Sequence, residues 1–420
     1  MIKRLKPKSE FGRNILTLMT GTTIAQSIPV AITPILTRLY TPEDFGMLAM
    51  FVALTAIIGS VANGRYELAI MLPEKDEESI NIAALCLLIA VGLSLFILIT
   101  VVAFSSQIVH LLDNQGIKFW LYFVPFVVLM TGMFNALNYL NTRKLLYKDI
   151  AKANIYKSVG MASIQLGVGF VKSGATGLIS GQIVAQMISN YRLAKNAKQN
   201  YDTNTVKLSE ITRLAKRYQD FPKFSMWAVL ANSLAYNLTN ILISFYYSIA
   251  TLGFYSLAQK ILGMPASLIG GSIGQVYFQE ATTEKQQTGN AVDTFNKTIK
   301  KLLILSVAMF TPLYFILPAV FEIVFGQEWR IAGKYAQIIL PFVAAQFVAA
   351  ALSNTNNIFE KQKIALLWQI GLLLLSIGLI FYSNFFQIEF FEFLKNLSIC
   401  LFLYYGLLLF ILWKVSQGRL

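Results

Sequence analysis

Long apolar runs recur along the whole of this 420-residue chain. Twelve can be placed, with approximate bounds 14–37, 45–72, 80–109, 119–142, 154–171, 173–191, 224–248, 252–278, 302–325, 335–359, 364–382 and 394–413. Each is long enough to cross a hydrocarbon core of ~30 Å at a rise of ~1.5 Å per residue. Charged residues make up only 13% of the chain, against roughly 25% in a soluble domain, so a water-facing surface cannot cover these runs. The sequence therefore predicts an all-α polytopic membrane protein with twelve transmembrane helices.

Lysines and arginines are distributed unequally over the connections between these runs. One side of the membrane collects 27 of them, with Lys157 counted in the connection after the fourth run, and the other side holds 6. Because Lys and Arg near span ends remain cytoplasmic, we expect a multi-pass protein of the bacterial inner membrane with both termini in the cytoplasm. The net charge of +14 is explained by this topology and by anionic lipid headgroups, so we expect membrane lipids and no nucleic acid as partners.

The longest polar stretch, 192–223, divides the runs into two sets of six that resemble each other. Tyr40 and Gly46 match Tyr247 and Gly253 at an offset of 207. A Pro-Phe pair followed by two asparagines on the fourth run recurs on the tenth at an offset of 216. We therefore predict an N-terminal six-helix lobe at 1–200, a cytoplasmic linker at 201–223 and a C-terminal six-helix lobe at 224–420. Six helices per repeat give a parallel repeat, with substrate between the lobes and rocking of one lobe providing alternating access.

Few ionisable residues fall inside the predicted spans, and a central Lys or Arg costs roughly 2.5 to 3.5 kcal/mol there. Lys260 lies eight residues into the eighth run, about 12 Å deep at ~1.5 Å per residue. It is a candidate for a cavity cation that attracts a diphosphate, or a snorkelling lysine at a lobe surface. Arg65 and Glu67 lie near the end of the second run, and their i,i+2 spacing on a helix argues against a direct salt bridge. Arg65 is a candidate for substrate binding and Glu67 for gating or coupling, unless they form ion pairs between the lobes.

Polar side chains also follow two of the runs. Gln26 and Thr33 on the first run, with Asn237 and Asn240 on the seventh, fit the wall of a sugar-contacting cavity. They fit helix packing equally well, because such side chains often join helices in membranes. His110 is the only histidine, so no histidine-cluster metal site or cofactor is expected.

Four stretches resemble the polysaccharide flippases of the multidrug/oligosaccharidyl-lipid/polysaccharide exporter superfamily, specifically the O-antigen or lipopolysaccharide type. They are residues 38–46 (RLYTPEDFG), 64–70 (GRYELAI), 274–281 (GQVYFQEA) and 325–333 (FGQEWRIAG). The resemblance implies two six-helix bundles around a central cavity and a cargo of undecaprenyl-diphosphate-linked oligosaccharide. It also implies coupling to an ion gradient, with a polysaccharide polymerase and a chain-length regulator as partners.

The related flippases of peptidoglycan precursor have cavity cations on helices 1, 2 and 8. Arg65 on helix 2 and Lys260 on helix 8 are the counterparts here. Helix 1 departs from that pattern, because no cation lies between Arg13 and Arg38.

Two alternatives remain. A cation-coupled multidrug exporter of the same superfamily would be expected to bury an acidic coupling residue in its N-terminal bundle, and Glu67 is the one such residue in the predicted spans there. A membrane glycan polymerase or ligase would need a catalytic constellation, normally on a sizeable periplasmic loop. The predicted periplasmic connections are short and offer no paired carboxylates, so we expect a transporter and not an enzyme.

Overall fold

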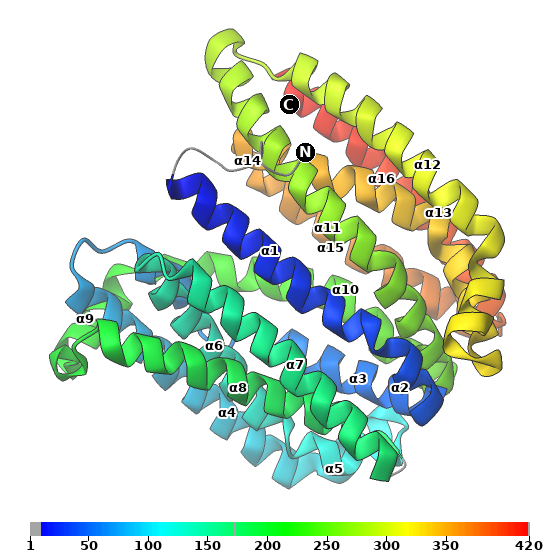
Figure 1. Cartoon of the computed structure of the whole chain (residues 1–420), viewed down its shortest axis with the longest axis horizontal. Helices are drawn as coiled ribbons and strands as arrows, with labels where there is room; N and C mark the ends of the chain where they lie inside the picture. Colours follow the sequence, from blue (N-terminus) through cyan, green and yellow to red (C-terminus); the bar gives the residue numbers. More distant parts are fainter. Residues whose placement is uncertain (1–9, 172–173, 419–420) are drawn as a thin grey trace. The chain divides into compact units, whose positions relative to one another are not determined.

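The computed structural model describes residues 10–171 and 174–418, and over those ranges it contains helices and no strands. The predicted all-α class is confirmed. Contacts divide the chain into two compact units, Met1–Ile241 and Leu242–Leu420, whose helices are labelled in Figure 1. The lobe boundaries at 200 and 224 stay a prediction. The cations at 3–8, which belong to the predicted charge pattern, lie outside the described residues.

The first unit consists of long helices joined by short ones. In order they are α1 (Glu10–Ala31), α2 (Thr33–Leu39), α3 (Pro42–Gly59), η2 (Tyr66–Met71), α4 (Asp76–Leu112), η3 (Gln115–Ile117), α5 (Lys118–Leu121), α6 (Val124–Arg143), α7 (Tyr147–Val171), α8 (Thr176–Asn200), η4 (Thr203–Thr205), α9 (Leu208–Arg217), η5 (Phe221–Ser225) and most of α10 (Met226–Tyr246). Helix α7 packs against α1 and α8, and α6 packs against α4 and α8 (Figure 1).

Close approach of α4 to α6 depends on Gly132. A Cβ atom at this position would lie 2.6 Å from the Cβ of Ala90 on α4 and 3.3 Å from that of Ala62. Small residues of this kind let helix backbones approach in membranes. The approach brings both helices against the segment that joins α3 to α4.

The run predicted as one helix over 45–72 is interrupted. Helix α3 ends at Gly59, and the 3₁₀-helix η2 begins at Tyr66. Between them Gly64 and Arg65 both have positive φ, 57° and 66°. A left-handed residue cannot continue a right-handed helix, and Gly64 adopts this conformation without a steric penalty. Arg65 and Glu67 therefore do not lie on an α-helix.

The predicted linker at 201–223 is not an open connection, because it contains the amphipathic helix α9. Ile211 and Leu214 on its inner face are buried, and α9 packs against α4. On α9, Arg213 forms an ion pair of 2.6 Å with Glu78 on α4 and another of 2.6 Å with Glu210 in its own helix. These contacts attach the linker to the first unit.

The second unit is arranged around α13 (Arg330–Leu352). The other elements are the end of α10, α11 (Ile249–Thr288), α12 (Val292–Phe325), η6 (Gln327–Trp329), α14 (Thr355–Ile358), α15 (Gln362–Phe385) and α16 (Phe390–Ser416). Helices α11, α12 and α16 all pack against α13, whose apolar window is the most buried of the candidate spans.

Eight helices among the described residues are long and apolar enough to cross a membrane, and a ninth span arises if the pair Gln115–Leu121 and Val124–Arg143, bent by 49°, is counted as one. The chain is thus a multi-pass membrane protein. The number twelve stays a prediction, since α1, α7 and α8 do not meet this criterion of length and apolarity.

Candidate functional site

The break between α3 and η2 is held by Asn63. Its Nδ2 donates to the carbonyl oxygens of Cys86 on α4 and Gly132 on α6, both at 3.1 Å, and its Oδ1 accepts from Asn135 at 3.4 Å. One buried amide therefore ties three elements together. Tyr66 adds a hydrogen bond of 2.9 Å from its hydroxyl to the carbonyl of Ala215 on α9. The chain that carries Arg65 is fixed on both sides.

Arg65 and Glu67 form a direct ion pair, with Nη1 of the arginine 3.0 Å from Oε1 of the glutamate. The expectation that they would not pair is wrong, because it assumed helical geometry whereas Arg65 is left-handed. The glutamate side chain is 5% exposed and the arginine side chain 24%. Arg65 Nε and Glu67 Oε2 are buried without a hydrogen-bond partner among the described residues. The pair therefore retains one donor and one acceptor that a ligand or a water molecule can use.

Lys260 is the twelfth residue of α11 in the second unit, and its side chain is exposed. The residues two positions before and two positions after it, Ala258 and Leu262, are buried. Lys260 thus lies on the face of α11 opposite its packed face. Since Arg65 and Lys260 belong to different units, their joint action on one substrate stays a prediction.

The two predicted wall residues of the first run have different environments. Gln26 on α1 is exposed. Thr33 is fully buried, and its hydroxyl donates to the carbonyl of Pro29 at 2.6 Å, where α1 ends and α2 begins. Such a back-bonded hydroxyl supports the bend between two helices that carry Pro29 and Pro34. A sugar-contacting role for either residue stays a prediction.

On α10 the two predicted asparagines also differ. Asn237 Nδ2 donates to the carbonyl of Ser233 at 2.9 Å, and the Ser233 hydroxyl donates to the carbonyl of Ala56 on α3 at 3.2 Å. Asn240 has a buried Oδ1 without a hydrogen-bond partner among the described residues, as does Asn232. These two free acceptors, two helical turns apart, could accept hydrogen bonds from hydroxyl groups.

Sequence reasoning missed Lys157, which it placed in a cytoplasmic connection. The residue lies well inside α7, and its Nζ is 5.0 Å from the centroid of the Phe134 ring on α6, a cation–π geometry. The signal was available, since position 157 falls within the predicted run 154–171. Asn63 was also missed, because a single amide in an apolar run carries no spacing signal.

The sequence matches the model of one known protein family. A family model described as "polysaccharide biosynthesis protein" matches residues 35–333, which is most of the chain. No curated protein sequence matches it.

Solved structures show the same fold. The lipid II flippase MurJ in an inward closed conformation has a TM-score of 0.74 at 12% identity, covering 97% of this chain and 90% of that one. A transporter of the MOP superfamily from Pyrococcus furiosus has a TM-score of 0.60 at 12% identity, with coverages of 97% and 96%. An outward-facing multidrug resistance MATE family transporter of the same superfamily has 0.60 at 13%, with coverages of 97% and 95%.

Proposed function

Because this chain belongs to the polysaccharide biosynthesis protein family, we propose that it flips an undecaprenyl-diphosphate-linked oligosaccharide from the cytoplasmic to the periplasmic leaflet by alternating access. The product would serve the assembly of O-antigen or a related surface polysaccharide. The family match over 35–333 carries this proposal. The fold shared with a lipid II flippase supports a lipid-linked cargo.

The diphosphate needs cations, and Arg65 and Lys260 supply them in this proposal. Arg65 lies on a non-helical backbone, and its Nε has no hydrogen-bond partner among the described residues. Its planar group presents several donors in a fixed geometry that suits phosphate oxygens. Lys260 contributes a compact charge on the exposed face of α11.

The glycan needs donors and acceptors of hydrogen bonds. In this proposal the sugar hydroxyl groups bind to side-chain amides, those of Asn237 and Asn240 on α10 and of Gln26 on α1. Asn240 Oδ1 has no hydrogen-bond partner among the described residues and can accept one from a hydroxyl group. Thr33 is assigned to the wall only if the bend at Pro29 opens during transport. Glu67 is the proposed gating or coupling residue, and the coupling ion is not assigned.

A reconstitution assay tests the function directly. Purified protein in liposomes should make a labelled undecaprenyl-diphosphate oligosaccharide, loaded on one leaflet, accessible to a membrane-impermeant glycosidase on the other. Empty liposomes are the control. No gain in accessibility over empty liposomes, at several pH and sodium gradients, would refute the proposal.

A second candidate function is a cation-coupled multidrug exporter, which the fold shared with a multidrug resistance MATE family transporter supports. Glu67, buried in the first unit, would then bind the coupling cation. Ethidium efflux from the same liposomes, abolished by Glu67→Gln, would favour the exporter. The polymerase and the chain-length regulator are proposed partners of the flippase alone.

A further inference from the structure

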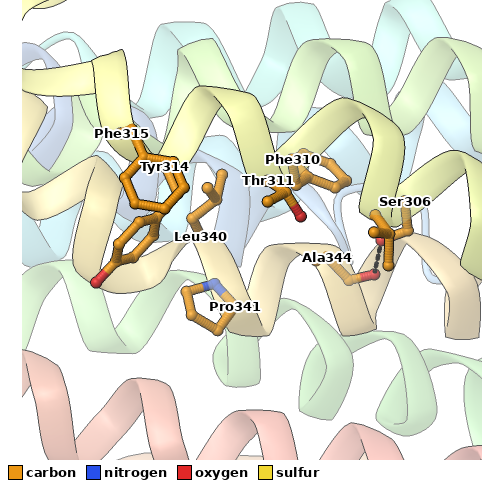
Figure 2. A pocket seen from close by; sticks show the side chains of 9 residues that line it. Ser306, Phe310, Thr311, Tyr314, Phe315, Leu340, Pro341 and Ala344 are labelled. Carbon is orange, nitrogen blue, oxygen red and sulfur yellow. Dashed lines mark hydrogen bonds between the residues drawn. The ribbon is translucent and has the colours of Figure 1, made fainter.

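Two adjoining hollows lie over α13 in the second unit, between α12 and α16. The first, of about 240 Å³, is lined by α12 and α13. Figure 2 shows the rings of Tyr314 and Phe315 at one end and the Ser306–Ala344 hydrogen bond at the other. The second, of about 390 Å³, is lined by α12, α13 and α16. Because Tyr314 and Pro341 line both, we treat them as one depression, the α13 groove.

Prolines fix the shape of this groove. Pro318 has no N–H, so the carbonyl of Tyr314, four residues earlier, loses its helical donor. Gln337 on α13 replaces that donor, with Nε2 2.8 Å from the Tyr314 oxygen. Nearby, a Cβ at Gly333 would lie 2.7 Å from the Cα of Pro318, so the two helices are in close contact beside the bend. The wall and floor of the α13 groove are therefore joined by a specific contact.

Three polar side chains that line the groove are hydrogen-bonded within the protein. Ser398 on α16 donates to the carbonyl of Ile338 at 2.7 Å, and Ser306 on α12 donates to that of Ala344 at 3.4 Å. Gln337 is bonded as described above. What the groove offers to a ligand is thus mainly the apolar surface of rings and aliphatic groups, which favours a hydrocarbon occupant.

The surroundings of the groove point the same way. Helices α12, α13 and α16 are all candidate membrane spans, so the groove lies in a part of the second unit that we expect inside the membrane. Its rim includes Phe315 on α12, 74% exposed, and Leu403 on α16, 64% exposed. Hydrocarbon chains are the molecules available to cover such a surface in a bilayer.

One end of the groove carries a charge. Lys395, in the second turn of α16, lines the larger hollow, and its side chain is 52% exposed. It forms an ion pair of 2.6 Å with the exposed Glu392. An ammonium group has three donors, so this pair leaves others for a second acceptor. A cation at the end of an apolar groove complements a lipid with a negatively charged headgroup.

We propose that the α13 groove binds one chain of an anionic glycerophospholipid, whose phosphate contacts Lys395. The apolar floor at Pro341 and Ala344 holds the chain, and Lys395 provides preference for the charged headgroup. Such a lipid would stay bound to the second unit and would not be transported. The proposal is independent of the cargo assigned above.

Native mass spectrometry of the full chain in detergent, with added phosphatidylglycerol or phosphatidylcholine, tests the headgroup. We expect phosphatidylglycerol to be retained preferentially. Lys395→Gln should weaken it about fivefold, the equivalent of the roughly 1 kcal/mol of one lysine near an anionic surface. Lys334→Gln, which removes an exposed cation on α13 that does not line the groove, is the matched control. Equal retention of both lipids, or equal effects of the two variants, would overturn the proposal.

Fluorescence quenching locates the chain without relying on a variant that fills the groove. Phe402→Trp places a reporter in the groove, and Phe381→Trp places one on α15 outside it; both phenylalanines are about half exposed. Phosphatidylglycerol with brominated chains, present as a small fraction in phosphatidylcholine liposomes, should quench the first reporter more strongly. Equal quenching would contradict the site. Displacement of the brominated lipid by a lower concentration of undecaprenyl phosphate would reassign the groove to an isoprenoid lipid and refute the glycerophospholipid.

Discussion

Glu67 and Arg65 are bound to each other, and this coupling determines how their substitution should be read. Removing Arg65 leaves a carboxylate that is 5% exposed without its counter-ion. Leaving one partner of a buried pair uncompensated costs on the order of 3 kcal/mol. A loss of transport after a single substitution could therefore reflect either lost substrate contact or lost stability, and a pair of substitutions is needed to separate them.

We predict that Arg65→Ala lowers the melting temperature of the protein in detergent, and that Arg65→Ala with Glu67→Gln restores most of it. The second substitution removes the unpaired charge, so the coupling between the two sites should be visible in a double-mutant cycle. Transport of lipid-linked oligosaccharide should stay low in both variants if Arg65 binds the diphosphate. Recovery of transport together with stability would assign the arginine a structural role only.

Lys260 has an exposed side chain, and the buried residues Ala258 and Leu262 lie on the other side of α11. We predict that Lys260→Ala reduces surface polysaccharide severalfold while the amount of membrane protein stays constant, and that Lys260→Arg keeps part of the activity. Immunoblotting and glycan staining measure the two quantities. Lys301→Ala, at an exposed lysine of α12, is the control. Normal polysaccharide in Lys260→Ala would leave Lys260 as a snorkelling lysine.

Residue positions in the spans were predictable, whereas residue contacts were not. The sequence located the rare charges because each is conspicuous in an apolar run. It failed on the Arg65–Glu67 contact, since that contact depends on the backbone at Gly64 and Arg65 turning left-handed. It also failed on Lys157, whose contact with Phe134 depends on how α6 and α7 pack. When apolar residues occur all round a helix, the sequence has no hydrophobic periodicity that would indicate which face packs against a neighbour.

At the scale of the elements, apolarity predicted where helices lie but not where they are interrupted. Helix α4 covers the predicted run 80–109, and α15 covers 364–382. The interruptions at Ile32 and at 60–65 arise from Pro29, Pro34 and the left-handed pair, inside runs that were each predicted as one continuous helix. The amphipathic helix α9 was missed because 201–223 was assigned by its polarity alone.

Docking of α9 can be tested by proteolysis. Leu214, on the inner face of α9, is fully buried within the first unit, so Leu214→Asp should release the helix and raise trypsin cleavage after Arg213 and Arg217 severalfold. Leu208→Asp is the matched control, because Leu208 begins the same helix and is 74% exposed. Cleavage rates are measured on the detergent-solubilised protein by mass spectrometry. Equal rates in the two variants would mean that α9 is not held by its apolar face.

At the scale of the whole molecule, the predicted orientation in the membrane is the premise of any directional transport. The excess of lysine and arginine on one side predicts that both termini are cytoplasmic. Each unit offers exposed positions in connections predicted on opposite sides. They are Lys118 and Thr203 in the first unit and Gln387 and Gln287 in the second.

We predict that cysteines at 118 and 387 react with a membrane-impermeant maleimide in intact spheroplasts, and that cysteines at 203 and 287 react only after the membrane is opened. The background must lack Cys86, which is buried, and Cys400, so both are first replaced by Ala. Because each unit is probed on both sides, the assay also tests the parallel repeat: an inverted second half would exchange the labelling of 287 and 387 while leaving 118 and 203 unchanged. Labelling at 203 in intact spheroplasts would reverse the orientation, and with it the direction of export that the charge distribution predicts.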